Sequence, residues 1–283
     1  MNNDVPLTKH GRKLVWHDEF TGKTLNPENW HMQRSMFTEN RIYDNGEKHI
    51  RIENNNLHMQ IHRNGDTYSL PQGLSTKNCM NFKYGYLEMR AKIPYRHSAW
   101  PSFWLLGNTP FHNPKLNWHA EVDIFEVFSS VNRISPNLHK WGTHGHTMLP
   151  GIENSIVRAY NFENYENLNN EYHTYGFLWD EHEMAFLIDD NCYFKSCIDE
   201  KSSFVSQNYP TTEGFHEFLY IILNNEMFTE SSKWKPDGSA ATPEDPMPID
   251  YWVNWIRLYQ NSEKEKIHFK ADIEKKQLQN END

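Results

Sequence analysis

The sequence predicts an all-β protein, an antiparallel sandwich of two packed sheets. Much of its 283 residues falls into short segments rich in apolar and aromatic side chains, and turn-forming residues separate these segments. Almost no stretch shows the 3.6-residue period of an amphipathic helix. Phe, Trp and Tyr, which favour strands, make up 14% of the chain. Many strands without helices between them leave a sandwich as the expected architecture.

The strands of the N-terminal half follow from alternation and turn residues. The segment 84–93 alternates for ten residues and stops at Pro94, which ends a strand. The run 100–106 is nearly continuously apolar, so a strand buried on both faces is expected there. All expected strands in this half cover residues 13–20, 41–43, 50–53, 57–61, 84–93 and 100–106.

The C-terminal half continues the same pattern. Its expected strands cover residues 173–179, 184–188, 193–195, 218–224 and 251–259. Between them, 129–150 is expected to be loop with a short strand, and 154–170 a surface loop or short helix. Residues 261–283 are dominated by charge, which predicts a solvated helix or a disordered tail. Because no repeat or linker interrupts the chain, we expect one domain over residues 12–260.

The stretch from Trp118 to Phe128 places three carboxylates within six residues, as Glu121-Val-Asp123-Ile-Phe-Glu126. Because side chains on a strand alternate between faces, Glu121 and Asp123 share one face. Strict alternation would turn Glu126 towards the apolar side, whereas a one-residue β-bulge after Asp123 would bring it back beside the other two. Carboxylates on one face raise one another's proton affinity, which suits acid–base chemistry better than stability.

Two other interpretations of this stretch remain open at the level of spacing. Acidic residues that alternate with Val and Ile also describe the solvated face of an antiparallel strand. A cation site is a further alternative, but no Asp- and Asn-rich loop with a central glycine follows, as a calcium loop would require. Spacing alone therefore does not separate a catalytic strand from a solvated one.

Charge and hydropathy exclude several classes of partner. The formal charge is −10 and no long basic run precedes the C-terminal tail, so neither a nucleic-acid nor a membrane partner is expected. No apolar run approaches the ~20 residues of a membrane span. The first ten residues lack the apolar core of a signal peptide, which predicts either a cytoplasmic protein or an exported one whose signal has been removed.

Five further motifs accompany the carboxylate stretch. They are Leu14-Val-Trp-His-Asp-Glu-Phe20, Phe82-Lys-Tyr-Gly-Tyr-Leu-Glu-Met-Arg-Ala-Lys-Ile-Pro94, Trp100-Pro-Ser-Phe-Trp-Leu-Leu106, Tyr172-His-Thr-Tyr-Gly-Phe-Leu-Trp179 and Trp252-Val-Asn-Trp-Ile-Arg-Leu-Tyr259. Together with E-x-D-x-x-E, they resemble the motifs of glycoside hydrolase family 16, in the bulged form of its laminarinase-, agarase- and galactanase-like members. A lone E-x-D-x-x-E would be weak evidence, but six motifs in family order over most of the chain are strong.

The resemblance implies a jelly-roll sandwich of the concanavalin A type with a substrate cleft across its concave face. It implies cleavage of a β-linked polysaccharide with retention of configuration. By position, Glu121 would be the nucleophile, Glu126 the acid/base, and Asp123 the residue that hydrogen-bonds the nucleophile. The expected partner is a polysaccharide or oligosaccharide, no catalytic metal or cofactor is expected, and we expect a monomer.

Departures from the family pattern bear on the substrate. Asn117-Trp-His-Ala120 replaces the W-P-x-x-G that precedes the nucleophile of laminarinase-like members, and Leu223-Asn-Asn-Glu-Met227 replaces L-N-x-x-x-G-G. The Gly-rich loops common in β-1,3-glucanases are missing. These differences favour a galactan or a host glycan, with β-1,3-glucan as the alternative. Asn254 stands where the closing strand of the family has Asp, which argues against its occasional structural calcium.

The other candidates for substrate contact are Trp100, Trp104, Trp118, His139, Trp141 and Glu226. We expect Trp118, three residues before the nucleophile, to stack on a sugar rather than to cap the core. Trp100 and Trp104 have the same phase and should share a face, and by resemblance Trp100 reaches the cleft. His139 matches a histidine that family members carry shortly after the acid/base.

Three activities remain open. They are a retaining endo-β-glycosidase, a transglycosylase with the same residues, and a non-catalytic carbohydrate-binding protein on the same fold. The presence of all three carboxylates argues against the last of these, because a binding protein has no need of them. The loops expected to line the subsites, and so to choose the substrate, are 31–40, 107–117, 129–150 and 225–248.

Overall fold

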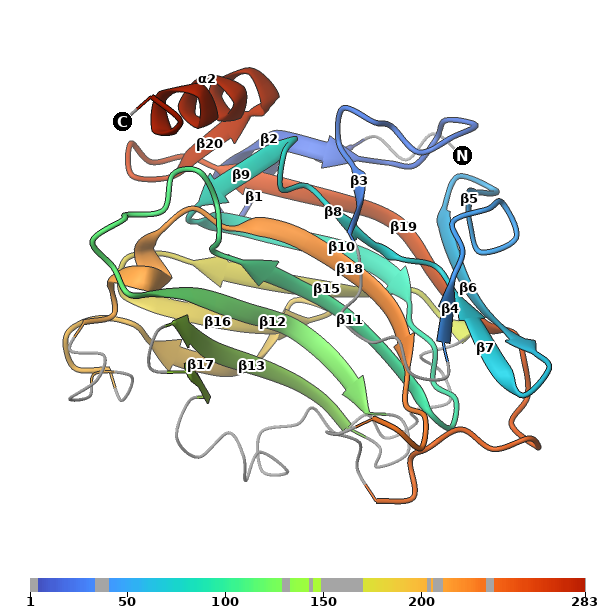
Figure 1. The fold of residues 1–283 in the computed structure, drawn as a ribbon. Coiled ribbons are helices and arrows are strands. Elements are labelled where there is room, and N and C mark those ends of the chain that lie inside the picture. Colours follow the sequence, from blue (N-terminus) through green and yellow to red (C-terminus); the bar gives the residue numbers. More distant parts are fainter. Residues whose placement is uncertain are drawn as a thin grey trace.

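Two large, mainly antiparallel sheets lie face to face in the computed structural model of the chain (Figure 1). The predicted all-β sandwich is therefore confirmed. The structure describes residues 5–33, 41–128, 133–142, 145–148, 170–202, 205, 211–232 and 237–282.

The larger sheet contains the closing strand β19, which pairs with β10 on one side and with β6 and β2 on the other. Its order is β17-β16-β15-β10-β19-β6-β7-β4, with β1, β2 and β5 attached. The bounds are β1 Thr8–Lys9, β2 Arg12–Asp18, β4 Arg41–Tyr43, β5 Ile50–Ile52, β6 Leu57–Asn64, β7 Thr67–Leu70, β10 Gly85–Lys92, β15 His173–Trp179, β16 Glu183–Ile188, β17 Asn191–Cys197 and β19 Ile249–Gln260.

The smaller sheet carries the three carboxylates. Its order is β14-β13-β12-β11-β18-β8-β3, so β11 lies between β12 and a strand from much later in the chain, β18. The bounds are β3 His31–Gln33, β8 Gly73–Ser75, β11 Ala99–Leu106, β12 Trp118–Phe128, β13 Arg133–Gly142, β14 Gly145–Met148 and β18 Tyr220–Met227.

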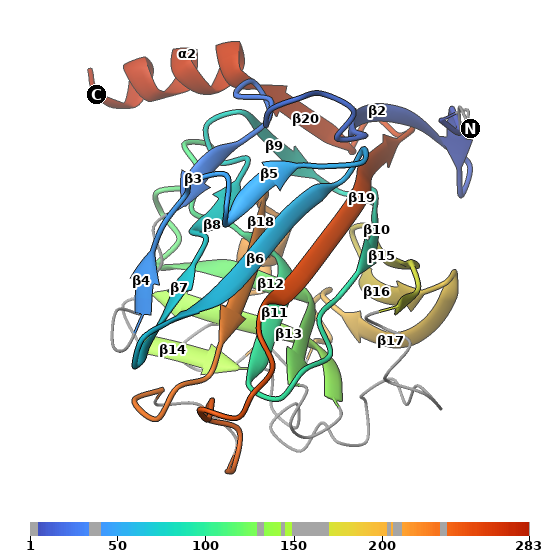
Figure 2. The ribbon, with the colours of Figure 1, turned by 90° about the vertical axis from the view of Figure 1, so that its right-hand side faces the viewer.

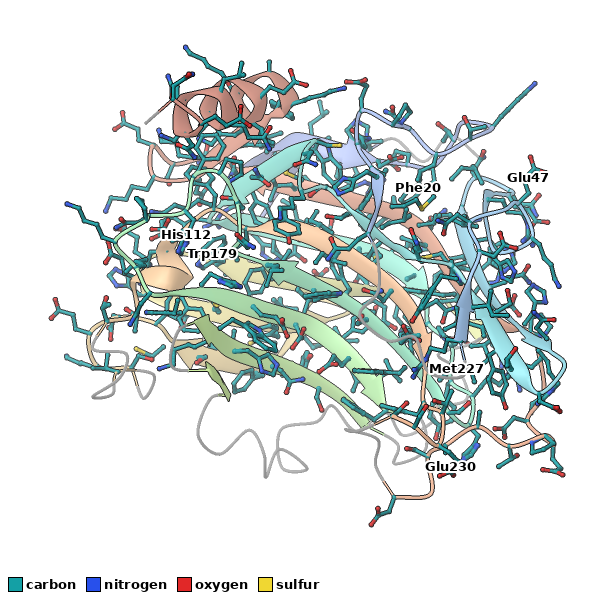
Figure 3. The ribbon with its side chains drawn as sticks, in the orientation of Figure 1. Phe20, Glu47, His112, Trp179, Met227 and Glu230 are labelled. Carbon is teal, nitrogen blue, oxygen red and sulfur yellow. The ribbon has the colours of Figure 1, made fainter. Side chains whose placement is uncertain are left out.

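Apolar side chains from both sheets fill the space between them. Phe103 and Val122 of the smaller sheet and Phe177 of the larger sheet are 0% exposed and belong to one cluster. Figure 3 shows Trp179 inside the molecule, whereas Glu47 and Glu230 lie at its periphery. Because β11 and β12 commit one face to this core, their polar side chains gather on the opposite face of the smaller sheet.

Three regions of the smaller sheet and its surroundings bear on the expectations. Residues 133–142, expected to be mainly loop, form the ten-residue strand β13. The run 100–106 is not buried on both faces, because Trp100, Trp104 and Leu106 are only half-buried on the polar side. The segment 154–170 lies outside the described residues, apart from Asn170.

The C-terminal tail is more ordered than its charge suggests. β20 (Lys266–Phe269) pairs antiparallel with β9 (Met80–Lys83), and α2 (Lys270–Asn280) follows at once. Most of α2 is exposed, as expected for a solvated helix, but Ile273 is 0% exposed. Figure 2 shows both elements at one end of the sandwich, beside β9. Among the described residues, no helix combines the length and the apolar character needed to cross a membrane.

Candidate active site

A β-bulge in β12 places the three carboxylates on one face. On the β11 side, Trp104 pairs with Asp123. The preceding residue, Phe103, pairs with Phe125, so Ile124 is the extra residue of the bulge. Ile124 and Phe125 are 2% and 0% exposed and both belong to the core. The bulge after Asp123 that the sequence predicts is therefore confirmed, and it returns the third carboxylate to the polar face.

Strand β13 brings a histidine and a tryptophan to Glu121. Nε2 of His139 lies 3.0 Å from Oδ2 of Asp123 and 3.6 Å from Oε1 of Glu121. The indole N–H of Trp141 donates to Oε2 of Glu121 over 2.8 Å. Both oxygens of Glu121 thus face a ring nitrogen, and the N–H of Trp141 favours the ionised carboxylate.

Glu126 accepts a hydrogen bond on each oxygen. The indole N–H of Trp100 donates to Oε1 over 2.9 Å. Nδ2 of Asn137 donates to Oε2, and Asn137 is also the cross-strand partner of Asp123. A protonated carboxyl group keeps acceptor capacity alongside its O–H, so these bonds are compatible with a general acid at Glu126.

The carboxyl groups are shielded from water. The side chains of Glu121 and Asp123 are 16% and 5% exposed. Burial, with the charge of Asp123 as the next cause, raises the pKa of Glu121 to about 8 and that of Glu126 to about 7. Burial also raises the pKa of Asp123 to about 8. At neutral pH the group of three therefore retains protons, which a general acid beside a nucleophile requires.

Trp100 and Trp104 share the polar face of β11, as their phase predicts. Trp100 stacks on Phe228 with ring centroids 4.7 Å apart, while its indole N–H reaches Glu126. Trp104 donates through its indole N–H to Oδ1 of Asn224 on β18 over 2.9 Å. Both rings are half-buried on the side of the sheet that carries the carboxylates.

The expectation that Trp118 stacks on a sugar is wrong. Its side chain is 2% exposed and packs against Phe215 in the core, with ring centroids 5.3 Å apart. The regular part of β12 explains this position, because a residue three places before Glu121 lies on the opposite face of the strand.

The expectation of substrate contact at Glu226 is also wrong. Glu226 is 4% exposed. Its Oε1 lies 3.0 Å from Nε of Arg41, and its Oε2 accepts from the hydroxyl of Tyr43 over 2.8 Å. With both oxygens engaged, Glu226 links β18 to β4 instead of offering an acceptor to a ligand.

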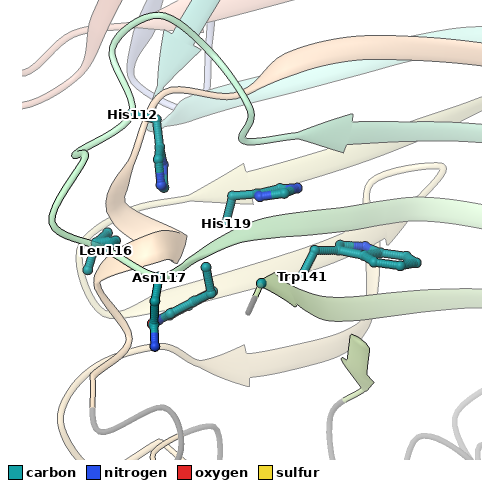
Figure 4. A pocket seen from close by; sticks show the side chains of 7 residues that line it. His112, Leu116, Asn117, His119 and Trp141 are labelled. Carbon is teal, nitrogen blue, oxygen red and sulfur yellow. The ribbon is translucent and has the colours of Figure 1, made fainter. Parts of the chain in front are cut away.

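A shallow pocket of about 430 Å³ adjoins the Glu121 end of the carboxylate row (Figure 4). His119 lies two residues before Glu121 on the same face of β12, and the wall opposite comes from loop 107–117. Burial lowers the pKa of His119, so this ring is uncharged at neutral pH. The full lining is His112, Leu116, Asn117, Trp118, His119, Trp141 and Gly142.

Sequence reasoning missed Asn137 and His119. Asn137, His139 and Trp141 alternate along β13, so a period of two was present in a segment expected to be loop. Pro136 hid it, since proline argues against an internal strand. In the structure Pro136 lies opposite the bulge, between the pairs Asp123–Asn137 and Glu126–Ser135, where the ladder is already interrupted.

The site also has a geometry that could suit a metal ion. Glu121, Asp123 and His139 offer ligand atoms within 4.8 Å of one another. However, Trp141 directs an N–H at Glu121, and the neighbouring Glu126 accepts from two further N–H groups. Such donors compete with a cation for the carboxylate oxygens, so the set fits protons better than a metal.

The residues around Asn254 do not fit a structural calcium ion. Oδ1 of Asn254 accepts from Nη1 of Arg90 over 2.9 Å, and its Nδ2 donates to the carbonyl oxygen of Asn55 and to Oδ1 of Asn56. A calcium site needs several free oxygen ligands, and the guanidinium of Arg90 would repel the ion.

The chain is similar to known proteins in both sequence and fold. The sequence pattern of glycosyl hydrolases family 16 matches residues 36–240. Glucan endo-1,3-beta-glucosidase A1 of Niallia circulans is 24% identical over 276 residues, which cover 88% of this chain and 38% of that protein. The chain also spans only 34% and 35% of the length of two further curated relatives.

Two solved structures show the same sandwich. One comes from work reporting that prominent members of the human gut microbiota express endo-acting O-glycanases to initiate mucin breakdown; its TM-score is 0.70 at 22% identity, with 92% of this chain and 95% of that chain covered. The endo-beta-1,3-glucanase of Pyrococcus furiosus has a TM-score of 0.68 at 21% identity, with 90% and 98% covered. The fold is thus the jelly-roll sandwich that the motifs imply.

Proposed function

Because this chain belongs to glycosyl hydrolases family 16, we propose that it cleaves β-glycosidic bonds within a polysaccharide and retains the configuration of the anomeric carbon. Glu121 is the nucleophile, Glu126 the general acid/base, and residues 12–260 are the catalytic domain. The observation that supports this most strongly is the bulged strand β12, which presents one buried and two half-buried carboxyl groups on one face.

In the first step, Glu121 attacks the anomeric carbon while Glu126 gives its proton to the glycosidic oxygen. The bond between the anomeric carbon and that oxygen breaks, the leaving chain departs as an alcohol, and an ester joins the sugar to Glu121. The indole N–H of Trp141 supports this step because it stabilises the ionised Glu121. Burial raises the pKa of Glu126 to about 7, so Glu126 keeps a proton to donate near neutral pH. The reactive molecules are those in which Glu121, whose pKa is raised to about 8, is ionised.

In the second step, the ionised Glu126 takes a proton from water, and the hydroxide oxygen attacks the anomeric carbon. The ester to Glu121 breaks, the sugar is released with its original configuration, and Glu126 is protonated again. Asp123 lies between the two glutamates in sequence, and after burial its charge is the next cause that raises the pKa of each. His139, 3.0 Å from Asp123, fixes the orientation of that carboxyl group.

The substrate class we propose is a neutral β-galactoside chain, as in galactans or mucin-type host glycans. Asn117-Trp-His-Ala120 departs from the laminarinase pattern directly before the nucleophile. The described residues that line the pocket beside Glu121 include no Asp, Glu, Lys or Arg, which suits an uncharged sugar. The likeness to a structure from work on endo-acting O-glycanases is consistent with this choice.

β-1,3-Glucan is the second candidate substrate. It is favoured by the relative from Niallia circulans, which is a glucan endo-1,3-beta-glucosidase. The two candidates share the catalytic steps and differ only in which sugar the subsites accept.

The test is the release of oligosaccharides from a panel of polysaccharides by the wild type, Glu121→Gln and Glu47→Gln. The panel contains β-1,3-glucan, mixed-linkage glucan, agarose, porphyran, carrageenan, β-1,4-galactan, and keratan-type and mucin glycans. We expect release from mucin glycans or a galactan, its loss in Glu121→Gln, and no change in Glu47→Gln. Glu47 is exposed and lies at the periphery, so this control makes the same charge change away from the site (Figure 3).

Each other outcome has a definite meaning. Release from β-1,3-glucan alone would replace the proposed substrate with the second candidate. Products that are longer than the supplied substrate would identify a transglycosylase. Binding without release would identify a carbohydrate-binding protein, and release that survives Glu121→Gln would contradict the assigned nucleophile.

A further inference from the structure

The C-terminal segment Lys266–Asn280 is attached to the body of the protein by more than chain continuity. Its strand β20 forms a four-residue antiparallel ladder with β9. Ile273 of α2 is 0% exposed. A fully solvated helix would bury no side chain, so this segment packs against the sandwich.

This segment contacts the loop that connects β11 to β12. The imidazole of His268 stacks on Phe111 of that loop, with ring centroids 4.0 Å apart and an interplanar angle of 7°. The same imidazole lies 4.5 Å from the ring of Phe218, which precedes β18. From α2, Nδ2 of Asn280 donates to the carbonyl oxygen of Pro110 over 3.1 Å. Residues 110–111 are therefore held from outside by the C-terminal segment.

The next residues of the same loop form a wall of the pocket beside Glu121. His112, Leu116 and Asn117 line it from the loop side (Figure 4). Trp141 lines it from β13 and also donates its indole N–H to Glu121. The pocket thus shares Trp141 with the candidate catalytic site, and its outer wall begins one residue after Phe111.

We propose that the segment Lys266–Asn280 is a specificity element of the cleft: through His268 it positions loop 107–117, and so sets the shape of a subsite for a neutral sugar unit beyond the one held at Glu121. The sugar-binding part of this inference rests on the proposed function. His268 is a positioning residue, since it lies outside the pocket lining.

A competing support for the loop comes from the 3-10 helix η3 (Glu213–His216) and the residue after it. The backbone N–H of Asn113 donates to Glu217 over 2.8 Å, and its side chain donates to Glu213 over 3.2 Å. These bonds fix Asn113 but not Pro110 or Phe111. Phe111 also contacts Phe218 directly, with ring centroids 5.2 Å apart, so His268 provides one of two ring contacts to Phe111. The contribution of His268 is therefore separable by substitution.

The chemistry of the pocket favours an uncharged sugar. Among the described residues, its lining contains two histidines, two tryptophans and one asparagine but no charged residue type. His112 and His119 meet edge to face, with ring centroids 6.2 Å apart and an interplanar angle of 86°. Ring faces and neutral hydrogen-bonding groups bind hydroxyls and the apolar side of a sugar, whereas a sulfate or carboxylate would find no cation.

The experiment compares His268→Ala with His268→Phe and with Lys264→Ala. Phenylalanine keeps a flat ring against both Phe111 and Phe218. Lys264 is an exposed residue of the tail that contacts only Glu181 among the described ion pairs. The first readout is backbone amide hydrogen exchange of residues 109–117, which requires no activity. The second is kcat/KM on the longest and the shortest oligosaccharide of the panel polysaccharide that the wild type cleaves.

We expect His268→Ala to speed exchange in the loop and to lower kcat/KM for the long substrate about three- to tenfold, mainly through KM, with the short substrate unchanged. His268→Phe should restore both readouts, and Lys264→Ala should match the wild type. Unchanged exchange in His268→Ala, with an unchanged Tm, would overturn the positioning role. Faster exchange with an equal effect on both substrates would overturn the subsite role. If no polysaccharide is cleaved, the proposed function fails while the exchange result still decides whether His268 positions the loop.

Discussion

Asp123 raises the pKa of both glutamates, in second place after burial, although it is assigned no bond-making role. Its carboxyl group is 5% exposed, and its charge is the second cause, after burial, that raises the pKa of Glu121 and Glu126. Groups that interact this strongly lose their protons as a unit. The pH dependence of catalysis is therefore a property of the three residues together.

Asp123→Asn should move the pH profile of kcat/KM to lower pH. The wild-type profile is expected to peak between about pH 7 and about pH 8, where Glu126 and Glu121 titrate. Asp123, whose pKa is about 8, carries a partial negative charge in this range. Asparagine removes that charge and makes each glutamate easier to ionise, so both limbs shift in the acid direction. Glu47→Gln serves as the control. A profile that stays in place, or moves to higher pH, would show that Asp123 does not couple to the glutamates.

At the scale of the element, β12 depends on one extra residue. Ile124 fills the core with 2% exposure, and the cross-strand pairs on both sides of it are in register with β11. Deleting Ile124 would restore ordinary alternation and leave all three carboxylates on the polar face. Deleting Val122 instead would turn either Glu121 or Asp123 into the core.

These two deletions therefore give opposite predictions. The Ile124 deletion should retain measurable oligosaccharide release, at a cost of about 2–5 kcal/mol in stability for the lost core side chain. The Val122 deletion should abolish release. Thermal unfolding would establish that each protein folds, and activity would be assayed well below each Tm. Loss of release in both folded variants would mean that activity requires the bulge itself, and not only the placement of the three carboxylates on one face of β12.

Elements with a clean local pattern were predictable, and those whose pattern is broken were not. The carboxylate strand and its bulge follow from the positions of Glu121, Asp123 and Glu126 in the sequence. Strand β13 was missed because Pro136 interrupts it, and only the bulge in the neighbouring strand makes that proline acceptable. The prediction for Trp118 was wrong because it considered only that Trp118 is close to Glu121 in sequence. A separation of three residues along a strand places the two side chains on opposite faces.

Long-range partners were the least predictable feature. Glu226 looked like a subsite residue, yet its carboxylate is used by Arg41 and Tyr43, which lie far away in sequence. The prediction for the tail used only its charge. The tail is in fact attached by the pairing of β20 with β9 and by the burial of Ile273. Neither the contact of Glu226 with Arg41 and Tyr43 nor the pairing of the tail with β9 produces a periodic pattern in the local sequence.

For the molecule as a whole, a buried acidic site lowers stability at neutral and alkaline pH. Burial raises the pKa of Asp123 to about 8 in the folded protein, against about 4 in an unfolded chain. Between these values the folded state binds more protons than the unfolded state, so stability falls as pH rises. Sites of this kind are maintained by function rather than by stability.

Asp123→Asn should therefore be more stable than the wild type at pH 8, by about 2–8 °C in Tm, because asparagine does not ionise. The difference should vanish at pH 4, where Asp123 is protonated in the folded protein. Scanning calorimetry at the two pH values would measure both effects. A variant that is less stable than the wild type at pH 8 would show that the ionised Asp123 is stabilised by its surroundings.

The most direct test of the account is the anomeric configuration of the first product. Proton NMR during the early minutes of cleavage distinguishes the β- from the α-anomer before mutarotation mixes them. A nucleophile at Glu121 and an acid/base at Glu126 predict that the β-anomer appears first and the α-anomer only later. If the α-anomer appeared first, the reaction would proceed by a single displacement, and the assignment of Glu121 as a covalent nucleophile would be refuted.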